Sequence, residues 1–282
     1  MHVMEHAIAH DVDETVVAPL QFTVNDGKPV IAKVFVPGGE HDKRTGTFEW
    51  HDVKIHDGRP NAHRLDLDKD GYRLIDHKSA VRDWFDDDEA RRVGYPETEA
   101  LVKAYTGCSK VVIFDHTPRV DDEALQAAHA LRPPSKYVHN DYTPESAEQR
   151  VRDILPADEA QMRLKKRYAS INVWRPVEGP VETAPLVICG YQDMKDDDLV
   201  LSERHYPDGR IGRIYHIAFN PVQRWTFFPH MMPDEAVLLK CYDSSRGETA
   251  RWTAHGSFQP PNKPANAAPR KSVELRTMLF WD

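Results

Sequence analysis

Two potential metal ligands stand two residues apart in the stretch 137–142, which reads YVHNDY. His139 and Asp141 come at the end of an expected short strand, and side chains at i and i+2 of a strand point to the same face. An imidazole and a carboxylate on one face can bind two adjacent positions of one metal ion. A second histidine would complete a set of two histidines and one carboxylate, which leaves positions open on ferrous iron. The pair therefore predicts an iron site, provided that the chain supplies that histidine.

His255 is the candidate for the second histidine. The chain has 15 histidines, so the tripeptide alone is better explained as a packed or surface histidine followed by a helix-capping aspartate. His255 changes this because it lies in a strand-like segment far downstream, residues 251–258. His230 is the nearest rival, since it also closes an apolar strand. We prefer His255 because it precedes a further motif that suits an acidic ligand.

That motif is the Arg-x-Ser sequence of Arg270 and Ser272, which occurs once in the chain and opens its final apolar strand. The two side chains share a strand face, so the guanidinium can bind a carboxylate with two hydrogen bonds while the hydroxyl adds a third. A dicarboxylate held in this way would chelate the metal through a 2-oxo acid at its other end. The order His-x-Asp, distal His, Arg-x-Ser is that of the iron(II)/2-oxoglutarate oxygenases.

From about residue 51 to its end, the chain resembles a family of iron(II)/2-oxoglutarate-dependent oxygenases of secondary metabolism. This is the family of the gibberellin desaturase, the meroterpenoid endoperoxygenase and the cephamycin-methoxylation-related proteins. The resemblance rests on six blocks in the right order, at residues 114–119, 138–141, 171–176, 240–244, 254–258 and 269–276. The first fifty residues show no such match, and we expect them to help shape substrate choice.

The resemblance implies that His139, Asp141 and His255 bind Fe(II). It implies that Arg270 and Ser272 bind the cosubstrate 2-oxoglutarate, with O2 as the oxidant. The block around the distal histidine departs from the usual Pro-His-Thr, because this chain has Ala254-His255-Gly256. The expected reaction is oxidation of a C–H bond of a small metabolite, by hydroxylation, desaturation or oxidative cyclisation.

Three further residues are candidates for binding the cosubstrate. Arg276 shares a strand face with Arg270 by the period of two, although a salt bridge with Glu274 would also explain it. Asn172 and Arg175 must point to opposite faces of a regular strand, so at most one of them faces the lumen of a barrel. Which of Arg270, Arg276 and Arg175 binds the carboxylate is left open.

Other residues and other chemistries fit the sequence less well. His116 and Arg119 follow a strand end, where a substrate contact and a structural hydrogen bond are equally compatible with the sequence. His205 and His216 lack comparable spacing and context. No Gly-x-Ser-x-Gly elbow, Walker loop or Gly-x-Gly-x-x-Gly motif is present. The alternatives are a non-catalytic jelly-roll protein that binds metal or ligand, and a zinc-type hydrolase, which would leave Arg270 and Ser272 without a role.

The sequence predicts that these residues are positioned by a mainly β structure with flanking helices. We expect helices over residues 84–106, 144–155 and 158–167, and a hairpin of residues 64–67 with 72–75. Many short strands follow, at residues 168–175, 185–192, 211–219, 223–229, 235–243, 251–258 and 271–281. Such strands are typical of a sandwich or barrel. With the resemblance, they predict a double-stranded β-helix (jelly-roll, cupin-like) core.

We expect one oxygenase domain over residues 1–282. Residues 1–50 would form an N-terminal extension of β character, and residues 136–282 the jelly-roll core with the metal site. The net charge of -8 argues against binding to a nucleic-acid backbone. No apolar run approaches the roughly 20 residues that span a bilayer, and we see no secretory signal. We therefore expect a cytoplasmic enzyme with a small-molecule substrate and without a membrane or nucleic-acid partner; a homodimer is left open.

Overall fold

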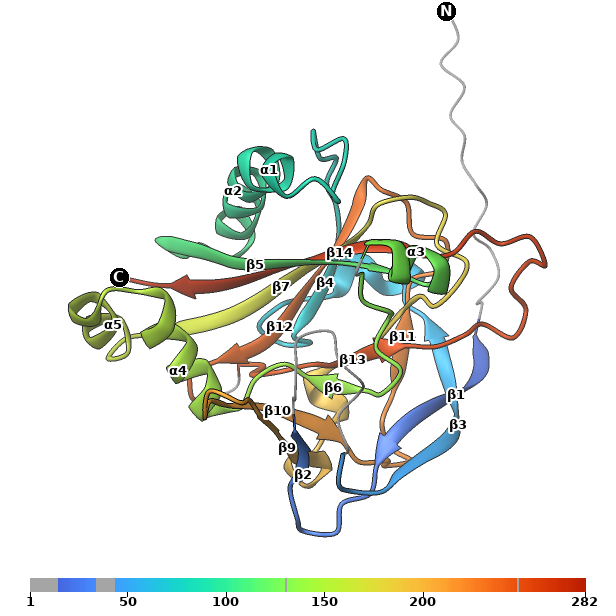
Figure 1. The fold of residues 1–282 in the computed structure, drawn as a ribbon, viewed down its shortest axis with the longest axis horizontal. Coiled ribbons are helices and arrows are strands. Elements are labelled where there is room, and N and C mark those ends of the chain that lie inside the picture. Colours follow the sequence, from blue (N-terminus) through green and yellow to red (C-terminus); the bar gives the residue numbers. More distant parts are fainter. Residues whose placement is uncertain (1–14, 34–43, 130, 248) are drawn as a thin grey trace, which may run out of the picture.

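Two β-sheets face each other and form the body of the molecule (Figure 1). The computed structural model describes residues 15–33, 44–129, 131–247 and 249–282. The five-stranded sheet has the order β4 (Tyr72–Asp76), β12 (Glu235–Asp243), β7 (Tyr168–Pro176), β14 (Lys271–Phe280), β5 (Lys110–Val120). The nine-stranded sheet has the order β1 (Val16–Thr23), β3 (Phe48–Asp57), β11 (Trp225–Phe227), β8 (Leu186–Cys189), β13 (Ala254–Ser257), β6 (His139–Asn140), β10 (Ile211–Ile217), β9 (Leu199–His205), β2 (Val30–Lys33).

The helices lie outside these sheets. In Figure 1, α1 (Asp87–Glu89) and α2 (Tyr95–Thr106) cover the outer face of the five-stranded sheet, joined by the π-helical turn η2 (Ala90–Gly94). The other helical segments are α3 (Glu123–His129), α4 (Pro144–Ile154), α5 (Ala157–Arg163), η1 (Arg59–Arg64), η3 (Tyr191–Asp193) and η4 (Asp196–Asp198). No helix in the described ranges is both long and apolar enough to span a membrane.

The five-stranded sheet is buried on both faces because its central strands are apolar in both registers. On β7, Tyr168 and Trp174 point into the space between the sheets, whereas Ile171 and Val173 pack beneath the helices. Every residue of β7 is buried. Alternation along the strand therefore assigns each side chain either to the lumen between the sheets or to the helix-covered face.

The structure confirms the mainly β jelly-roll class with flanking helices, but it corrects some expected elements. Residues 64–67 form no strand, because Asp66 builds a turn: its carbonyl accepts from the Asp70 amide at 2.7 Å and its Oδ1 from the Asp68 amide at 2.8 Å. The helix expected from residue 84 begins at Asp87, where Asp86 accepts from two amides of the first turn. Strand β9 was not predicted. Within residues 1–50, which were expected to have β character, residues 1–14 and 34–43 lie outside the described residues.

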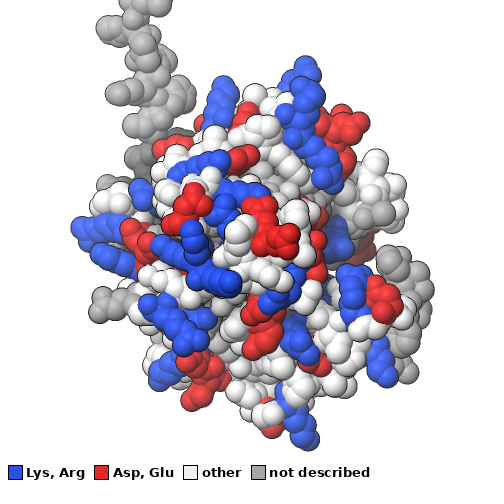
Figure 2. Space-filling model, turned by 90° about the vertical axis from the view of Figure 1, so that its left-hand side faces the viewer, with Lys and Arg blue, Asp and Glu red and all other residues white. Residues whose placement is uncertain are grey.

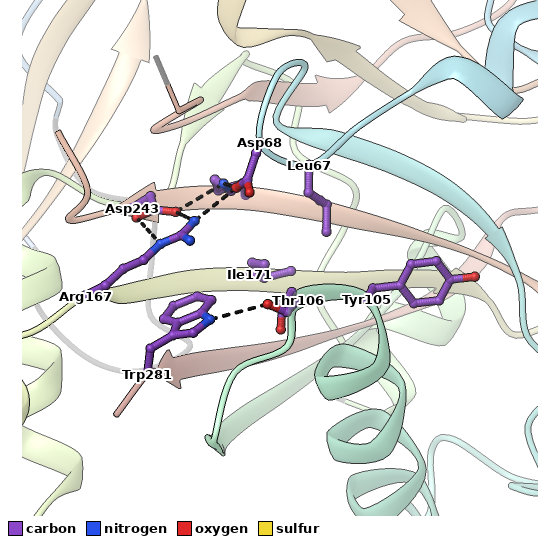
Figure 3. Close-up of a pocket in the computed structure, with 9 residues that line it drawn as sticks. Leu67, Asp68, Tyr105, Thr106, Arg167, Ile171, Asp243 and Trp281 are labelled. Carbon is purple, nitrogen blue, oxygen red and sulfur yellow. Dashed lines mark hydrogen bonds and ion pairs between the residues drawn. The ribbon is translucent and has the colours of Figure 1, made fainter. Parts of the chain in front are cut away.

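A buried cluster of charges ties the turn after residue 66 to the five-stranded sheet (Figure 3). The ammonium of Lys240 lies 2.6 Å from Asp68 Oδ1 and 3.1 Å from Asp243 Oδ2. Arg167 also binds Asp243, at 2.7 Å. The side chains of Lys240 and Asp243 are only 2% and 0% exposed. Since neither charge can reach water, each depends on its ion pairs for compensation.

We predict that Asp243→Asn lowers the free energy of unfolding by about 3 kcal/mol, because it leaves the buried Lys240 ammonium short of a counter-charge. Urea denaturation measures this loss. Asp68→Asn is the matched control: the Asp68 side chain is 58% exposed, so its removal should cost less than about 1 kcal/mol. Equal losses in the two variants would show that burial does not control this cluster.

The surface around α4 and α5 carries charges of both signs. Figure 2 shows acidic and basic side chains intermixed over this face, without one large area of a single sign. Within α5, Arg163 and Glu159 pair at 3.6 Å, four residues apart. Intermixed charges of this kind keep a helix surface hydrated and contribute little to the stability of the fold.

Candidate metal centre

His139, Asp141 and His255 converge at one point of the lumen. One ligand atom from each lies within 4.8 Å of the others, and this is the only such group of three or more among the described His, Cys, Asp and Glu residues. His139 Nε2 lies 3.5 Å from Asp141 Oδ1, and the rings of His139 and His255 are 4.6 Å apart between centroids. The geometry therefore brings together the three residues predicted from the sequence.

Strand pairing explains this convergence of residues far apart in the chain. His139 in β6 stands directly opposite His255 in β13, so both imidazoles project from the same sheet face. Strand β6 ends at Asn140, and the chain then bends at Asp141. The bend brings the carboxylate beside the two rings.

Hydrogen bonding orients the His139 ring, and electrostatics shift the pKa values of His255 and Asp141. His139 Nδ1 donates to the Tyr137 carbonyl at 3.1 Å, which leaves the lone pair on Nε2, the atom that faces Asp141. Burial, together with the neighbouring His139, lowers the pKa of His255 to about 4. Burial alone would raise the pKa of Asp141, but the Arg276 guanidinium and the imidazoles hold it well below its usual range. A neutral imidazole and an ionised carboxylate are the forms that ligate iron.

A second layer of side chains fixes the Asp141 carboxylate. Its Oδ2 accepts from Asn172 Nδ2 at 2.8 Å and from Arg276 Nε at 3.3 Å. Asn172 also donates to Glu274 Oε1 at 2.6 Å. Because both donors use Oδ2, Oδ1 stays directed towards His139. Asn172 and Arg276 are thus neighbours of a candidate ligand, a position that the sequence did not indicate.

We predict that Asn172→Ala weakens binding of ferrous iron by 10- to 100-fold, the range typical when a ligand loses its outer partner. Anaerobic equilibrium dialysis measures the affinity. Asn220→Ala is the matched control, since Asn220 donates to the Asp198 carboxylate at 2.9 Å, away from the three ligands. Unchanged affinity in Asn172→Ala would mean that Asn172 does not hold Asp141 for a metal.

Arg270 lies beside the candidate ligands, and Ser272 follows two residues later at the start of β14. A pocket is lined by Arg270 together with His139, His255, Trp174 and six other residues. Arg270 is 4% exposed, and its guanidinium donates to the Ala184 carbonyl and lies over the Trp174 ring. Burial lowers the pKa of Arg270 to about 9. Such a cation is costly without an anion nearby.

The two other candidate arginines differ sharply from Arg270. Arg276 contacts three carboxylates, at 2.7 Å to Asp115, 3.3 Å to Asp141 and 3.4 Å to Glu274. Arg175 points to the opposite face of β7 from Asn172, as strand periodicity predicted. There it donates to the carbonyls of His77 and Pro233. The structure thus brings Asn172 to the metal ligands and leaves Arg175 outside the lumen.

Of the two weaker candidates near the end of β5, His116 lies away from the pocket and Arg119 lines it. His116 lies beneath the helices, 3.0 Å from the Tyr95 hydroxyl and 3.3 Å from the Asp87 carboxylate, which favours a structural role. Arg119 lines the pocket with Arg270 and donates to the Pro133 carbonyl at 2.8 Å.

The remaining candidate histidines are not part of the group of three ligands. His205 pairs with Glu203 at 2.9 Å. His230 adopts a positive φ of 51° after strand β11 and is not part of the group of metal-ligating side chains. His216 stands directly opposite His139, with its Nδ1 3.1 Å from the Thr23 hydroxyl. Burial, with the charges of its neighbours, lowers its pKa to about 3, so this ring stays neutral near pH 7.

Comparison with known proteins gives a consistent set of relatives. A family model described as "Oxidoreductase/YMDC permease-like domain" matches residues 20–280. The hydroxylase/desaturase CTB9 of Cercospora beticola is 31% identical over 255 residues, which cover 83% of this chain and 78% of that protein. The Fe(II)/2-oxoglutarate-dependent dioxygenase nvfI of Aspergillus novofumigatus is 28% identical, over 83% of this chain and 85% of that protein.

The fold is also similar to a solved structure. The iron and alpha-ketoglutarate-dependent endoperoxidase NvfI superposes with a TM-score of 0.83 at 24% identity, over 95% of this chain and 98% of that chain. This likeness extends over both sheets and supports the jelly-roll assignment.

Proposed function

This chain belongs to the Fe(II)/2-oxoglutarate-dependent oxygenases of secondary metabolism, and we propose that His139, Asp141 and His255 are its iron ligands. The enzyme uses Fe(II), 2-oxoglutarate and O2 to oxidise a C–H bond of a small metabolite. Two imidazoles and one carboxylate that converge at one point suit ferrous iron and leave positions open for other ligands.

The observation that carries the cosubstrate assignment is the contrast between Arg270 and Arg276. Arg270 has no ion pair with a described carboxylate, and its Nε, like the Ser272 hydroxyl, is buried without a described hydrogen-bond partner. Buried polar groups are rarely left unpaired, so two of them side by side indicate a missing ligand. Arg276 is already paired with three carboxylates. We therefore assign the far carboxylate of 2-oxoglutarate to Arg270 and Ser272.

In this arrangement, the residues of the protein bind the iron and orient one of its ligands. His139, Asp141 and His255 bind the iron, and Asn172 and Arg276 keep one oxygen of Asp141 turned towards it. When bound, iron and 2-oxoglutarate supply the oxidising chemistry, in which the cosubstrate becomes succinate and carbon dioxide and a substrate C–H bond is oxidised.

Two large apolar side chains line part of the site. Trp174 and Leu186, 3% and 6% exposed, line the same pocket as the ligands. An apolar wall strengthens the charge interactions of the Arg270 guanidinium and restricts the site to its intended reactants.

Succinate formation tests the proposed function. Purified enzyme with ferrous iron and 2-oxoglutarate in air should form succinate faster than Asp141→Ala, and a pool of small metabolites that contains the substrate should increase the rate further. Equal succinate formation by the enzyme and by Asp141→Ala would contradict the assignment of the iron ligands.

A further inference from the structure

Two arginines next to the proposed iron site have no carboxylate partner among the described residues, and we propose that they bind an acidic group of the substrate. These are Arg44 and Arg204, which meet at the ring of Tyr137. With Tyr137 and His216 they form what we call the Tyr137 cluster. The inference rests on the proposed function, because it takes the nearby His139 to be an iron ligand.

Strand register places the cluster on the face that carries the ligands. His216 stands opposite His139, and on the neighbouring strand Val200 stands opposite His216. Arg204 is four residues from Val200 and therefore projects from the same face. Arg44 bridges to Ala32, which pairs with Arg204. The two arginines thus stand on one face of the nine-stranded sheet, the face of His139.

Side-chain contacts extend the cluster to His139. The guanidinium of Arg44 lies 4.6 Å from the centre of the Tyr137 ring, and Arg204 Nη2 donates to the Tyr137 hydroxyl at 3.2 Å. The Tyr137 ring in turn lies 5.7 Å from that of His139 and 4.6 Å from that of His216. One aromatic ring therefore separates the two guanidiniums from a candidate iron ligand.

The charge of the cluster is not balanced by the described residues. Glu203, next to Arg204 in the chain, points to the other face of the sheet and binds Arg213 at 3.0 Å. Arg44 and Arg204 are half-buried, so water solvates them only in part. Two adjacent cations in such a place favour an anion, and guanidiniums bind carboxylates with several hydrogen bonds.

The aromatic rings next to the two arginines indicate the chemistry of the uncharged part of the ligand. Phe48 packs on His216 with centroids 5.9 Å apart, and His216 packs on Tyr137. Apolar and aromatic walls with a few charged groups are typical of sites for small molecules. We therefore assign the substrate to the carboxylate-bearing metabolites that contain a ring or another flat apolar group. Arg270 is left to the cosubstrate.

A pair of matched probes tests this assignment. Binding of 4-fluorobenzoate and 4-fluorobenzamide is measured by fluorine NMR on the enzyme with ferrous iron and saturating 2-oxoglutarate, without oxygen. The wild type should bind the benzoate at least about tenfold more tightly than the benzamide, as for a charged hydrogen-bonded pair. Arg204→Gln and Arg44→Gln should each remove most of this preference, whereas Arg204→Lys should keep part of it.

Arg213→Gln is the control, since it removes the same charge from the opposite face of the same hairpin. The inference is overturned if the wild type shows no preference for the benzoate, or if the preference survives both glutamine variants. If Arg204→Gln does not fold, Arg44→Gln and Arg204→Lys decide. Iron and 2-oxoglutarate binding is measured in the same samples, so that a failure of the proposed iron site is distinguished from a failure of the Tyr137 cluster.

Discussion

His255→Ala is expected to abolish binding of ferrous iron, whereas His230→Ala should leave it unchanged. His255 faces His139 across paired strands, and removal of one of three ligands should cost more than the roughly 100-fold seen when an outer partner is lost. His230 is not part of the converging group. Anaerobic equilibrium dialysis with iron analysis measures both affinities.

One control makes this result specific. Thermal unfolding of the metal-free variants shows whether the fold survives, because His255 is 4% exposed and its truncation leaves a small cavity. Iron binding with wild-type affinity by a folded His255→Ala, together with its loss in His230→Ala, would reverse the assignment of the distal ligand.

Arg270→Gln is expected to weaken 2-oxoglutarate binding by about 2 kcal/mol or more, roughly 30-fold, because the far carboxylate loses a buried charged partner. A comparison with 2-oxovalerate, a 2-oxo acid without that carboxylate, isolates the contact. The variant should bind 2-oxovalerate as the wild type does, and its preference for 2-oxoglutarate should disappear. Calorimetric titration of the iron-loaded protein under nitrogen measures these affinities.

Arg276→Gln separates the two roles that the sequence left open. Arg276 donates to the Asp141 carboxylate, so its replacement should disturb the metal site. We therefore expect the affinities for 2-oxoglutarate and for 2-oxovalerate to fall to the same degree. If Arg276→Gln instead removed only the preference for 2-oxoglutarate, and Arg270→Gln affected both acids equally, the proposed roles of the two arginines would be exchanged.

Much of the fold followed from local patterns in the sequence. Long apolar strands such as residues 235–243 were predicted with their observed bounds, because both faces of that strand are apolar and turn residues flank it. Strand β9 was not predicted, because the consecutive polar residues Glu203, Arg204 and His205 interrupt the alternation of apolar and polar residues that indicates a strand. The turn at Asp66 was mistaken for a strand because its side-chain hydrogen bonds with backbone amides leave no periodic signal.

The residues of the site could be predicted from the sequence only in part. Spacing alone made His139 and Asp141 only a weak candidate pair, and His255 with the Arg270–Ser272 motif was needed to favour a metal site. The role of Asn172 depends on a contact with Asp141 across 31 positions, and strand periodicity fixed only its face. The choice among Arg270, Arg276 and Arg175 required their partners, which no spacing rule supplies. The Tyr137 cluster joins two strands, β9 and β10, to Arg44 and Tyr137, which lie in isolated β-bridges, and could not be assembled from the sequence.

A crystal structure of the enzyme grown without oxygen, with ferrous iron and 2-oxoglutarate, tests the central claim most directly. We predict one iron ion bound by His139 Nε2, Asp141 Oδ1 and the His255 ring, with the far carboxylate of 2-oxoglutarate on Arg270 and Ser272. Iron bound at other residues, or the 2-oxoglutarate carboxylate on Arg276 in place of Arg270, would contradict this account.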